Sequence, residues 1–536
     1  MNRYHLIILS LLSGTLFSLA WPASGFPALL FFAFVPLLLI ENHYFRKKKS
    51  ALGLFGYVYL SFFIWNVLTT WWIWNSTPVA LVAWALNSLF MAIVVILYHY
   101  TRKKIYQRNR GHVIFIIYWT GFEFLHLNWE LSWSWLNIGN GFASYYKWIQ
   151  WYEHTGILGG TLWVLIINVL IFKLFIMSMN EMKKYWRFVI QFGLVILLIF
   201  GPILLSFRTY MNFEEDGETI NAIVVQPNLD PYSEQYSVPP LQVVDMNLNL
   251  ALSKLENEVA FIVCPESTIQ ESIWESQLEA SPSLNSIQQF VDKNPNSRIV
   301  IGSSTFRRLA EGEDKTYAAR YHEGGDFWYY AYNTALYIDT SRLVQIHHKS
   351  MLTLGVEKMP SWRILAPVRN LAIDLGGTVG TLGADEEQIP FHSGDSVRIA
   401  PLICYESVFG EFTTEFVKNG ANVIFIITND GWWGNTPGHR QHLTFASLRA
   451  IECRRSIARS ANTGISAFID QKGDIHQKTE YWEPDVIKES LALNNRVTFY
   501  AQHGDYIGRV AAFLSIVYML LAISFFLGRK NFILAR

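Results

Sequence analysis

The segment VRIAPLICYESVFGEF (397–412) contains the two patterns that decide the fold of this chain. Its first half is an apolar run rich in Val and Ile, which is typical of a buried strand. Its second half opens an amphipathic helical pattern over 407–418. Cys404 lies at the change from strand to helix. Since a helix N-terminus favours the thiolate, this position predicts a reactive cysteine, with a buried structural cysteine as the alternative.

The same alternation continues on both sides of this segment. Further apolar runs predict strands at 220–225, 259–264, 298–303, 334–339, 422–428 and 464–470. Helical patterns fall at 241–256, 283–293 and 439–453. Strands interleaved with helices over about 300 residues predict a layered α/β domain.

Two other polar residues stand just beyond predicted strands, as Cys404 does. Glu266 follows a strand in VCPES (263–267), and Lys349 follows one in QIHHKS (345–350). Layered α/β domains gather their sites at strand ends. A thiol nucleophile needs a base for its proton, and the oxyanion that its attack creates needs a cation or N–H donors. Glu266, Lys349 and Cys404 therefore form a candidate catalytic set. The other cysteines, Cys264 and Cys453, are expected in the core.

Composition divides the chain into two parts. Charged residues are only 16% of 536, and 51% are hydrophobic, against about 25% charged in a typical soluble domain. Residues 207–507 hold 24 basic and 38 acidic residues, whereas the remainder holds 19 and 5. Apolar runs expected to cross a bilayer lie outside 207–507, at 5–20, 26–40, 51–74, 79–99, 113–128, 156–178, 188–206 and 508–528. The expected domains are seven transmembrane helices in 1–206, an extracytoplasmic catalytic domain in 207–507, and an eighth helix with a cytoplasmic tail in 508–536.

Basic residues occupy alternate loops between these runs. The basic loops lie around 46–49, 102–110 and 183–187, and the intervening short loops carry only Lys147. Because basic loops stay in the cytoplasm, both termini are expected there and 207–507 on the periplasmic side. The first run could instead be a signal peptide, which leaves this topology unchanged. Glu123 lies inside an expected span, where it is either a functional group or a polar lock between helices.

The order of the motifs resembles the nitrilase superfamily. The residues that carry the resemblance are Pro265-Glu266, Lys349 with Glu357, Cys404-Tyr405-Glu406, TNDGWWG (428–434) and RSANTGISAFID (459–470). Apolar spans on both sides of the domain, and WSWLNIGNGFASYYKWIQWYEHTGILGG (133–160), are similar to its apolipoprotein N-acyltransferase branch. The family usually has Pro-Phe-Gly-Glu after the lysine, whereas LTLGVEKMP (352–360) keeps only the glutamate and the later proline. This departure concerns the shape of the loop, and Glu357 is kept.

The resemblance implies a fold and a reaction. The fold is a four-layer αββα nitrilase-like (CN hydrolase) sandwich inserted in a polytopic bundle of eight transmembrane helices. The reaction moves an acyl chain from a phospholipid to a cysteine thioester, and then to the α-amine of the N-terminal diacylglyceryl-cysteine of an apolipoprotein. The implied location is the bacterial cytoplasmic (inner) membrane, where the protein would act as a monomer in lipoprotein biosynthesis.

The resemblance also implies residue roles. Cys404 is the nucleophile, Glu266 the general base, and Lys349 stabilises the oxyanion with the Tyr405 N–H. The Tyr405 side chain can equally be a packing residue. Among the supporting residues, Glu357 would orient Lys349, and Asn333 would support the loop that holds it. Glu406 would either support the site from behind or hold Lys349 from the other side.

A lid over the site is a further expectation. Moving about fifteen methylenes into water costs on the order of 12 kcal/mol, so the site should open laterally to lipid at the outer membrane surface. The apolar stretch MLTLGVEKMPSWRILA (351–366) is a candidate lid over it.

Several other chemistries find no support in the sequence. No metal or other cofactor is expected, because the histidines lack Cys or carboxylate partners at ligand spacing, and a surface or substrate-contact role is expected for His347, His348, His439 and His442. GxSxG, Walker-type and GxGxxG loops are absent. The chain has no overall basic character for nucleic acid.

Two other functions remain open. A membrane-tethered amidase would use the same three residues on a small amide, with water discharging the thioester. A non-catalytic binding or transport protein would use the outer domain only for recognition. Replacing Cys404 separates these classes, because only a catalyst would lose function.

Overall fold

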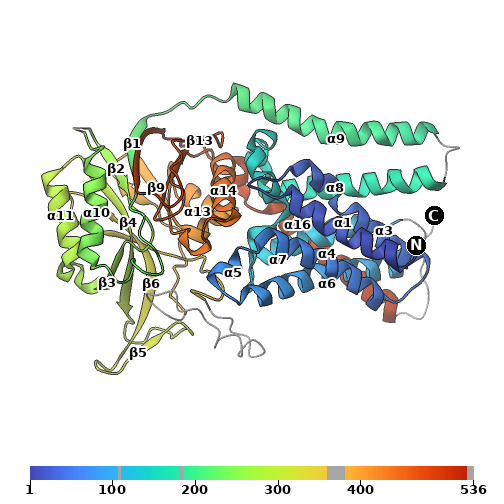
Figure 1. Ribbon diagram of the computed structural model, residues 1–536, viewed down its shortest axis with the longest axis horizontal. Helices are drawn as coiled ribbons and strands as arrows, with labels where there is room; N and C mark the ends of the chain where they lie inside the picture. Colours follow the sequence, from blue (N-terminus) through green and yellow to red (C-terminus); the bar gives the residue numbers. More distant parts are fainter. Residues whose placement is uncertain (107–109, 181–184, 257, 359–380, 528–536) are drawn as a thin grey trace. The chain divides into compact units, whose positions relative to one another are not determined.

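The computed structural model describes residues 1–106, 110–180, 185–256, 258–358 and 381–527. The chain forms two compact units (Figure 1). The helical unit comprises Met1–Trp74, Ala80–Asn212 and His503–Arg536, and the α/β unit comprises Asn75–Val79 and Phe213–Gln502.

Seven helical segments among the described residues are long and apolar enough to cross a membrane. One of them, Pro27–Arg46, is built from η1 (Pro27–Leu29), α2 (Leu30–Ala33) and α3 (Val35–Arg46). The other six are α1 (Arg3–Ala20), α4 (Ala51–Thr70), α6 (Ala80–Ile105), α8 (Tyr152–Asn180), α9 (Tyr185–Asn212) and α16 (Tyr506–Leu527). Each lies on an apolar run expected to span, so the chain is membrane-integrated.

The eighth expected span, 113–128, is the shorter helix α7 (Val113–Leu127). Its 15 residues cover about 22 Å, less than the roughly 30 Å of a hydrocarbon core. α7 packs against α6, α8 and α16, and Phe115 and Trp119 are buried. α7 is therefore shorter than the other expected spans, and that it crosses the membrane stays a prediction.

Glu123 on α7 is a polar lock, one of the two roles left open by the sequence. Its carboxylate accepts hydrogen bonds from Trp119 Nε1 at 2.9 Å, the Ile138 N–H at 3.0 Å and Thr161 Oγ1 at 2.6 Å. These donors tie α7 to α8 and to η3 (Ile138–Trp148). A second buried carboxylate, Glu41, pairs with Arg102. Arg102, which the sequence places at the start of a basic loop, is thus a buried residue of α6.

The α/β unit contains two sheets. In the first, the strand order is β14-β1-β2-β4-β6-β5, with β3 beside β4 and β7 beside β6. Its strands are β1 (Thr219–Gln226), β2 (Ala260–Val263), β3 (Ile269–Trp274), β4 (Ser297–Arg308), β5 (Arg320–His322), β6 (Phe327–Ile338), β7 (Gln345–His348) and β14 (Asp485–Ala492). In the second, the order is β13-β12-β11-β10-β9-β8. Its strands are β8 (Phe391–Ser393), β9 (Val397–Ile403), β10 (Val423–Thr428), β11 (Ile457–Ala461), β12 (Ala467–Ile469) and β13 (Ile475–His476).

Both sheets are parallel at their centres. β1, β2 and β4 run parallel in the first sheet, and β9, β10 and β11 in the second. Parallel strands are covered on both faces, which explains why AFIV (260–263) and VIFIIT (423–428) are continuous apolar runs. Their carboxyl ends point the same way and place the residues that follow them along one edge of each sheet.

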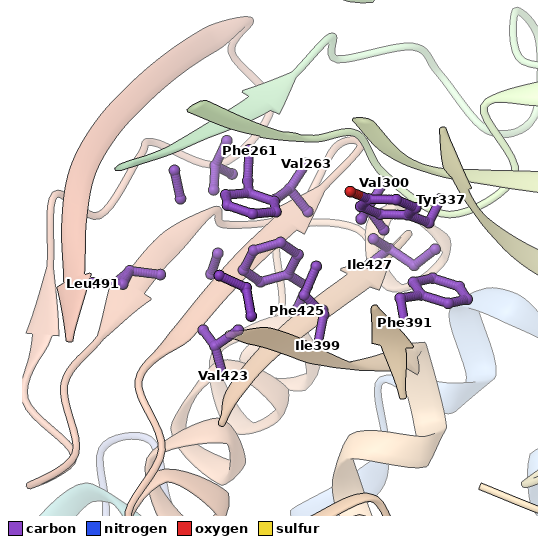
Figure 2. Close-up of a cluster of buried hydrophobic side chains, with 14 of the residues drawn as sticks. Phe261, Val263, Val300, Tyr337, Phe391, Ile399, Val423, Phe425, Ile427 and Leu491 are labelled. Carbon is purple, nitrogen blue, oxygen red and sulfur yellow. The ribbon is translucent and has the colours of Figure 1, made fainter. Parts of the chain in front are cut away.

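Two apolar layers hold the sheets and helices together. The first lies between the sheets, where Phe261 of β2 meets Phe425 of β10 with ring centroids 5.9 Å apart (Figure 2). The second lies between the first sheet and helices α10 (Pro240–Leu252) and α11 (Pro282–Lys293). On the second sheet, α13 (Gly410–Lys418) packs on β9, and α14 (Pro437–Cys453) packs on β12. The expected four-layer αββα sandwich is therefore confirmed (Figure 1).

A short segment from between the apolar helices belongs to the α/β unit. Asn75 Nδ2 donates to the Trp433 carbonyl at 2.9 Å, and Ser76 Oγ donates to the Trp432 carbonyl at 2.9 Å. From its position in the sequence, this segment was expected with the spans. These two hydrogen bonds join residues more than 350 positions apart in the sequence. No local sequence pattern predicts them.

Candidate active site

Three strand ends bring the candidate residues together. Glu266 follows β2, Lys349 follows β7 directly, and Cys404 follows β9 as the first residue of η7 (Cys404–Val408). Cys404 has a φ of +52°, a left-handed conformation that is rare outside glycine. Its backbone turns sharply where the strand ends, and the residue as a whole is half-buried.

Lys349 lies at the centre of the site. Its Nζ is 3.0 Å from Glu266 Oε1 and 2.9 Å from Glu357 Oε1. The ammonium is almost fully buried, with a side-chain exposure of 2%. Burial alone would lower the pKa of Lys349, but Glu266 and Glu357 outweigh it and hold the pKa well above its ordinary value. A charged ammonium is therefore fixed beside the nucleophile.

Asn333 on β6 holds both carboxylates in place. Its Nδ2 donates to Glu266 Oε1 at 2.8 Å and to Glu357 Oε1 at 2.9 Å. The backbone carbonyl of Asn333 accepts a hydrogen bond from the backbone N–H of Lys349 at 2.8 Å. Asn333 thus orients Glu266, Lys349 and Glu357. The sequence predicted only that it supports the loop that holds Lys349.

Glu266 is fixed from two further sides. Its Oε2 accepts from the Asn429 N–H at 3.1 Å. Its backbone lies against Gly302 of β4, whose N–H donates to the Pro265 carbonyl at 3.1 Å. A Cβ at position 302 would come within 2.6 Å of Glu266 Cα. Glycine is therefore required here for the close approach of the two backbones.

Glu357 is the second carboxylate on Lys349. Its Oε2 accepts from the Thr353 N–H at 2.9 Å. Burial acts to raise the pKa of Glu357, but Lys349, Thr353 and Asn333 together keep it below its usual value. The residue is an ionised partner of Lys349 within a loop that begins at Met351.

The surroundings of Cys404 favour its neutral thiol, although a helix start by itself would favour the thiolate. Burial raises its pKa, the nearby Glu266 carboxylate raises it further, and Lys349 only partly opposes them. η7 is a single 3-10 turn of five residues, whose dipole is too short to compete. The thiol can act as a nucleophile only when a base takes its proton, and Glu266 is the carboxylate beside it.

The two roles left open for Glu406 are separated by its contacts. Its carboxylate accepts from the Ser350 N–H at 2.6 Å and from the Ile403 N–H at 2.7 Å, and lies 3.2 Å from His347 Nε2. Glu406 thus ties the residue after Lys349 to the residue before Cys404. It supports the site from behind.

The sequence matches two family profiles that together cover both units. Residues 13–170 match "Apolipoprotein N-acyltransferase N-terminal domain", and residues 232–499 match "Carbon-nitrogen hydrolase". An apolipoprotein N-acyltransferase of Chlorobaculum tepidum is 29% identical over 96% of this chain and 96% of its own. That of Geobacter metallireducens is 24% identical over 93% and 91%, and that of Thermotoga maritima 24% over 95% and 92%. The chain belongs to the apolipoprotein N-acyltransferase family of carbon–nitrogen hydrolases.

Membership in the apolipoprotein N-acyltransferase family makes this chain a membrane-integrated acyltransferase with lipid and lipoprotein substrates. The part that matches the carbon–nitrogen hydrolases contains Glu266, Lys349, Glu357 and Cys404. The part that matches the N-terminal domain ends within α8. The candidate site therefore lies in the hydrolase-like part of the acyltransferase.

A buried network behind Cys404 was not predicted from the sequence. His442 Nε2 is 3.2 Å from the Cys404 carbonyl and 3.0 Å from Ser407 Oγ, which itself donates to that carbonyl at 2.7 Å. His442 Nδ1 is 2.9 Å from Asp430 Oδ1, and Asp430 Oδ2 accepts from Arg459 Nη2 at 2.6 Å. Although burial acts to raise the pKa of Asp430, Arg459 and His442 hold it far below its usual range. This network stabilises the left-handed turn at the nucleophile.

The surface role expected for the histidines is wrong, and their substrate-contact role stays a prediction. His347, His348, His439 and His442 are all buried. His347 and His348 point to opposite sides of β7, as their adjacent positions on a strand indicate. The His347 ring contacts the Glu406 carboxylate. The His348 ring contacts the carboxylates of Asp385 and Glu275. The sequence held an indirect signal for this network. Asp430, the partner of His442, follows the end of β10 just as Glu266 follows the end of β2.

Two other expectations concern the Tyr405 side chain and the candidate lid. The Tyr405 ring is buried and packs edge-on against Phe409 at 5.0 Å, which favours the packing role. Residues 359–366 of the candidate lid lie outside the described residues. Among the described residues, no group of three or more His, Cys, Asp or Glu side chains is arranged to hold a metal ion.

Proposed function

We propose that the protein transfers one acyl chain from a membrane phospholipid to the α-amine of an N-terminal diacylglyceryl-cysteine on an apolipoprotein. The transfer runs through a thioester on Cys404 in a ping-pong sequence. The observation that carries this proposal is the contact of a buried, charged Lys349 with Glu266 and Glu357 beside a neutral thiol. That set provides a base, a cation and a nucleophile at one place.

In the first half-reaction, Glu266 removes the thiol proton as Cys404 Sγ attacks the ester carbonyl carbon. The oxyanion that forms is stabilised by the Lys349 ammonium and by the Tyr405 N–H. As the C–O bond breaks, the protonated Glu266 returns its proton to the leaving oxygen. A lysophospholipid leaves, and the acyl chain stays on sulfur.

In the second half-reaction, the free α-amine attacks the thioester carbonyl. Glu266 takes the proton that the amine loses, the same cation stabilises the second oxyanion, and the C–S bond breaks. The thiolate regains the proton from Glu266, and the product is an amide. Because Glu266 carries the proton in both halves, one carboxylate suffices for the cycle.

The proposed location is the bacterial cytoplasmic membrane, with both termini in the cytoplasm and the α/β unit on the periplasmic side. Its support is the alternation of basic loops along the sequence. The protein is proposed to act as a monomer. Its partners are then the phospholipid donor, the diacylglyceryl apolipoprotein acceptor and the membrane itself, with no nucleic acid.

The test uses a phospholipid with an isotopically labelled acyl chain and a diacylated lipopeptide with a free N-terminus. The detergent-purified wild type should move the label into an amide on the lipopeptide, and Cys404→Ser and Glu266→Gln should not. An N-acetylated lipopeptide is the matched acceptor control and should stay unlabelled. Release of labelled fatty acid in place of lipopeptide would make the protein a lipid hydrolase, and turnover of small amides alone would favour the amidase.

A further inference from the structure

A groove opens at one end of the helical unit. It has a volume of about 560 Å³, within the roughly 300–1,000 Å³ that ligand pockets usually have. It lies where α1 begins, α3 ends and α8 ends. α3 packs against both α1 and α8.

The lining of the groove is divided by chemistry. Its apolar part is made by Ile8, Leu9, Leu39, Phe175, Ile176 and Met179. Its polar part includes Arg46 and Lys47, together with the imidazoles of His5 and His43. Among the residues that the structure describes, no Asp or Glu lines it. In the part of the chain that the structure describes, neither Arg46 nor Lys47 has a carboxylate partner, and both are exposed.

The groove lies far from the point where the chain leaves the helical unit. It is at the end of the bundle where α8 finishes and α9 begins. α9 then runs 28 residues to Asn212, about 42 Å at 1.5 Å per residue, before the chain enters the α/β unit. The groove and the chain's exit to the α/β unit are thus about a bilayer thickness apart along α9.

We propose that this groove binds one anionic phospholipid from the membrane leaflet that meets the basic loops. The acyl chains lie on the apolar part, and the phosphate-bearing headgroup lies against Arg46 and Lys47. Exposed cations that lie next to an apolar surface and have no carboxylate partner among the described residues match the charge and shape of such a lipid. The bound lipid is a structural ligand that joins α1, α3 and α8, separate from the acyl donor.

The test is native mass spectrometry of the full chain in a non-ionic detergent. Phosphatidylglycerol is titrated against phosphatidylcholine with the same acyl chains. Arg46→Ala/Lys47→Ala should weaken phosphatidylglycerol binding roughly 30-fold, since each such cation contributes about a factor of five. Lys48→Ala/Lys103→Ala is the matched control, because it removes the same charge from exposed residues that do not line the groove.

A second variant tests the apolar part with the charges intact. Ile8→Trp places a bulky ring in the groove at an exposed position, so the fold should tolerate it. It should abolish retention of phosphatidylglycerol. Equal loss of binding in the two alanine pairs, equal affinity for phosphatidylcholine, or unchanged binding in Ile8→Trp would each overturn the proposal. The readout is lipid binding alone, so it does not depend on the acyl transfer reaction.

Discussion

Gly302→Ala should disable the base without touching any side chain of the site. The new Cβ would lie 2.6 Å from Glu266 Cα, 2.6 Å from the Ser267 nitrogen and 2.7 Å from the Pro265 oxygen. All three are backbone atoms, so no flexible side chain can move aside. The Glu266 segment must shift by about 0.8 Å to reach the 3.4 Å at which ordinary contact begins.

This shift is large compared with the tolerance of the site. Glu266 Oε1 is 3.0 Å from Lys349 Nζ and 2.8 Å from Asn333 Nδ2, and a shift of about 0.8 Å takes both contacts to or past the limit of a hydrogen bond. A displacement of about 1 Å at a reacting group can cost about a hundredfold in rate. We therefore expect the rate of Cys404 acylation to fall between tenfold and a hundredfold. Overpacking should also cost about 1–3 kcal/mol of stability.

The assay is the rate at which the protein gains one acyl mass after mixing with phospholipid, followed by intact-protein mass spectrometry. Gly324→Ala is the matched control, because it adds the same methyl group to an exposed turn in the same unit, with its nearest contact a side-chain atom of His322 at 3.3 Å. The control should acylate at the wild-type rate. A folded Gly302→Ala protein that also acylates at the wild-type rate would refute the argument that the position of Glu266 limits the reaction.

Three further predictions concern the groups around the site. Glu357→Gln should slow acylation about 10- to 100-fold, the worth of one hydrogen bond to a charged group, and an unchanged rate in the same mass assay would count against its role on Lys349. His442→Ala should lower kcat about fivefold and leave the KM for phospholipid unchanged. His442→Gln, which can still donate to the Cys404 carbonyl, should recover most of the lost kcat. A change in KM alone would argue against a role of His442 in positioning Cys404. Burial acts to lower the pKa of His348, but Asp385 and Glu275 outweigh it and raise the pKa to about 9. The stability that this cation provides is therefore complete below about pH 6.5 and lost as the pH rises through about 9, at most about 3 kcal/mol. The difference in melting temperature between wild type and His348→Gln should shrink across that range, and a difference that stays constant would contradict the assignment.

The strand ends made much of the site predictable. Apolar runs such as VIFIIT (423–428) and AFIV (260–263) are buried on both faces, so a polar residue just beyond them stands out. That pattern is enough to place Glu266, Lys349 and Cys404 in one region. It extends in the same way to Asp430, which was not among the predicted residues although it follows β10 closely.

What the sequence did not show depends on partners from distant parts of the chain. β11 contains Arg459 and Ser460 at its centre, and both are fully buried. Arg459 pairs with Asp430, and Ser460 Oγ donates to the Val225 carbonyl at 2.7 Å. Polar residues in a central strand break the apolar pattern, and only the tertiary contact explains them.

The direction in which the pKa of the Cys404 thiol shifts could not be predicted from the sequence for a related reason. The sequence places it at a helix start, and that local feature favours a thiolate. The decisive neighbours are Glu266 and Lys349, which lie 138 and 55 positions earlier. The sign of the shift in its pKa depends on burial and on the balance of those two charges, which no local pattern contains.

The most direct test of the central claim is whether Cys404 carries the acyl chain. Detergent-purified protein is mixed with phospholipid, measured intact, and then digested so that fragment masses locate the adduct. We expect one acyl mass on Cys404, sensitive to neutral hydroxylamine as a thioester is, absent in Cys404→Ala, and lost when a diacylated lipopeptide with a free amine is added. An adduct on another residue, or acylated lipopeptide produced by Cys404→Ala, would contradict the thioester mechanism.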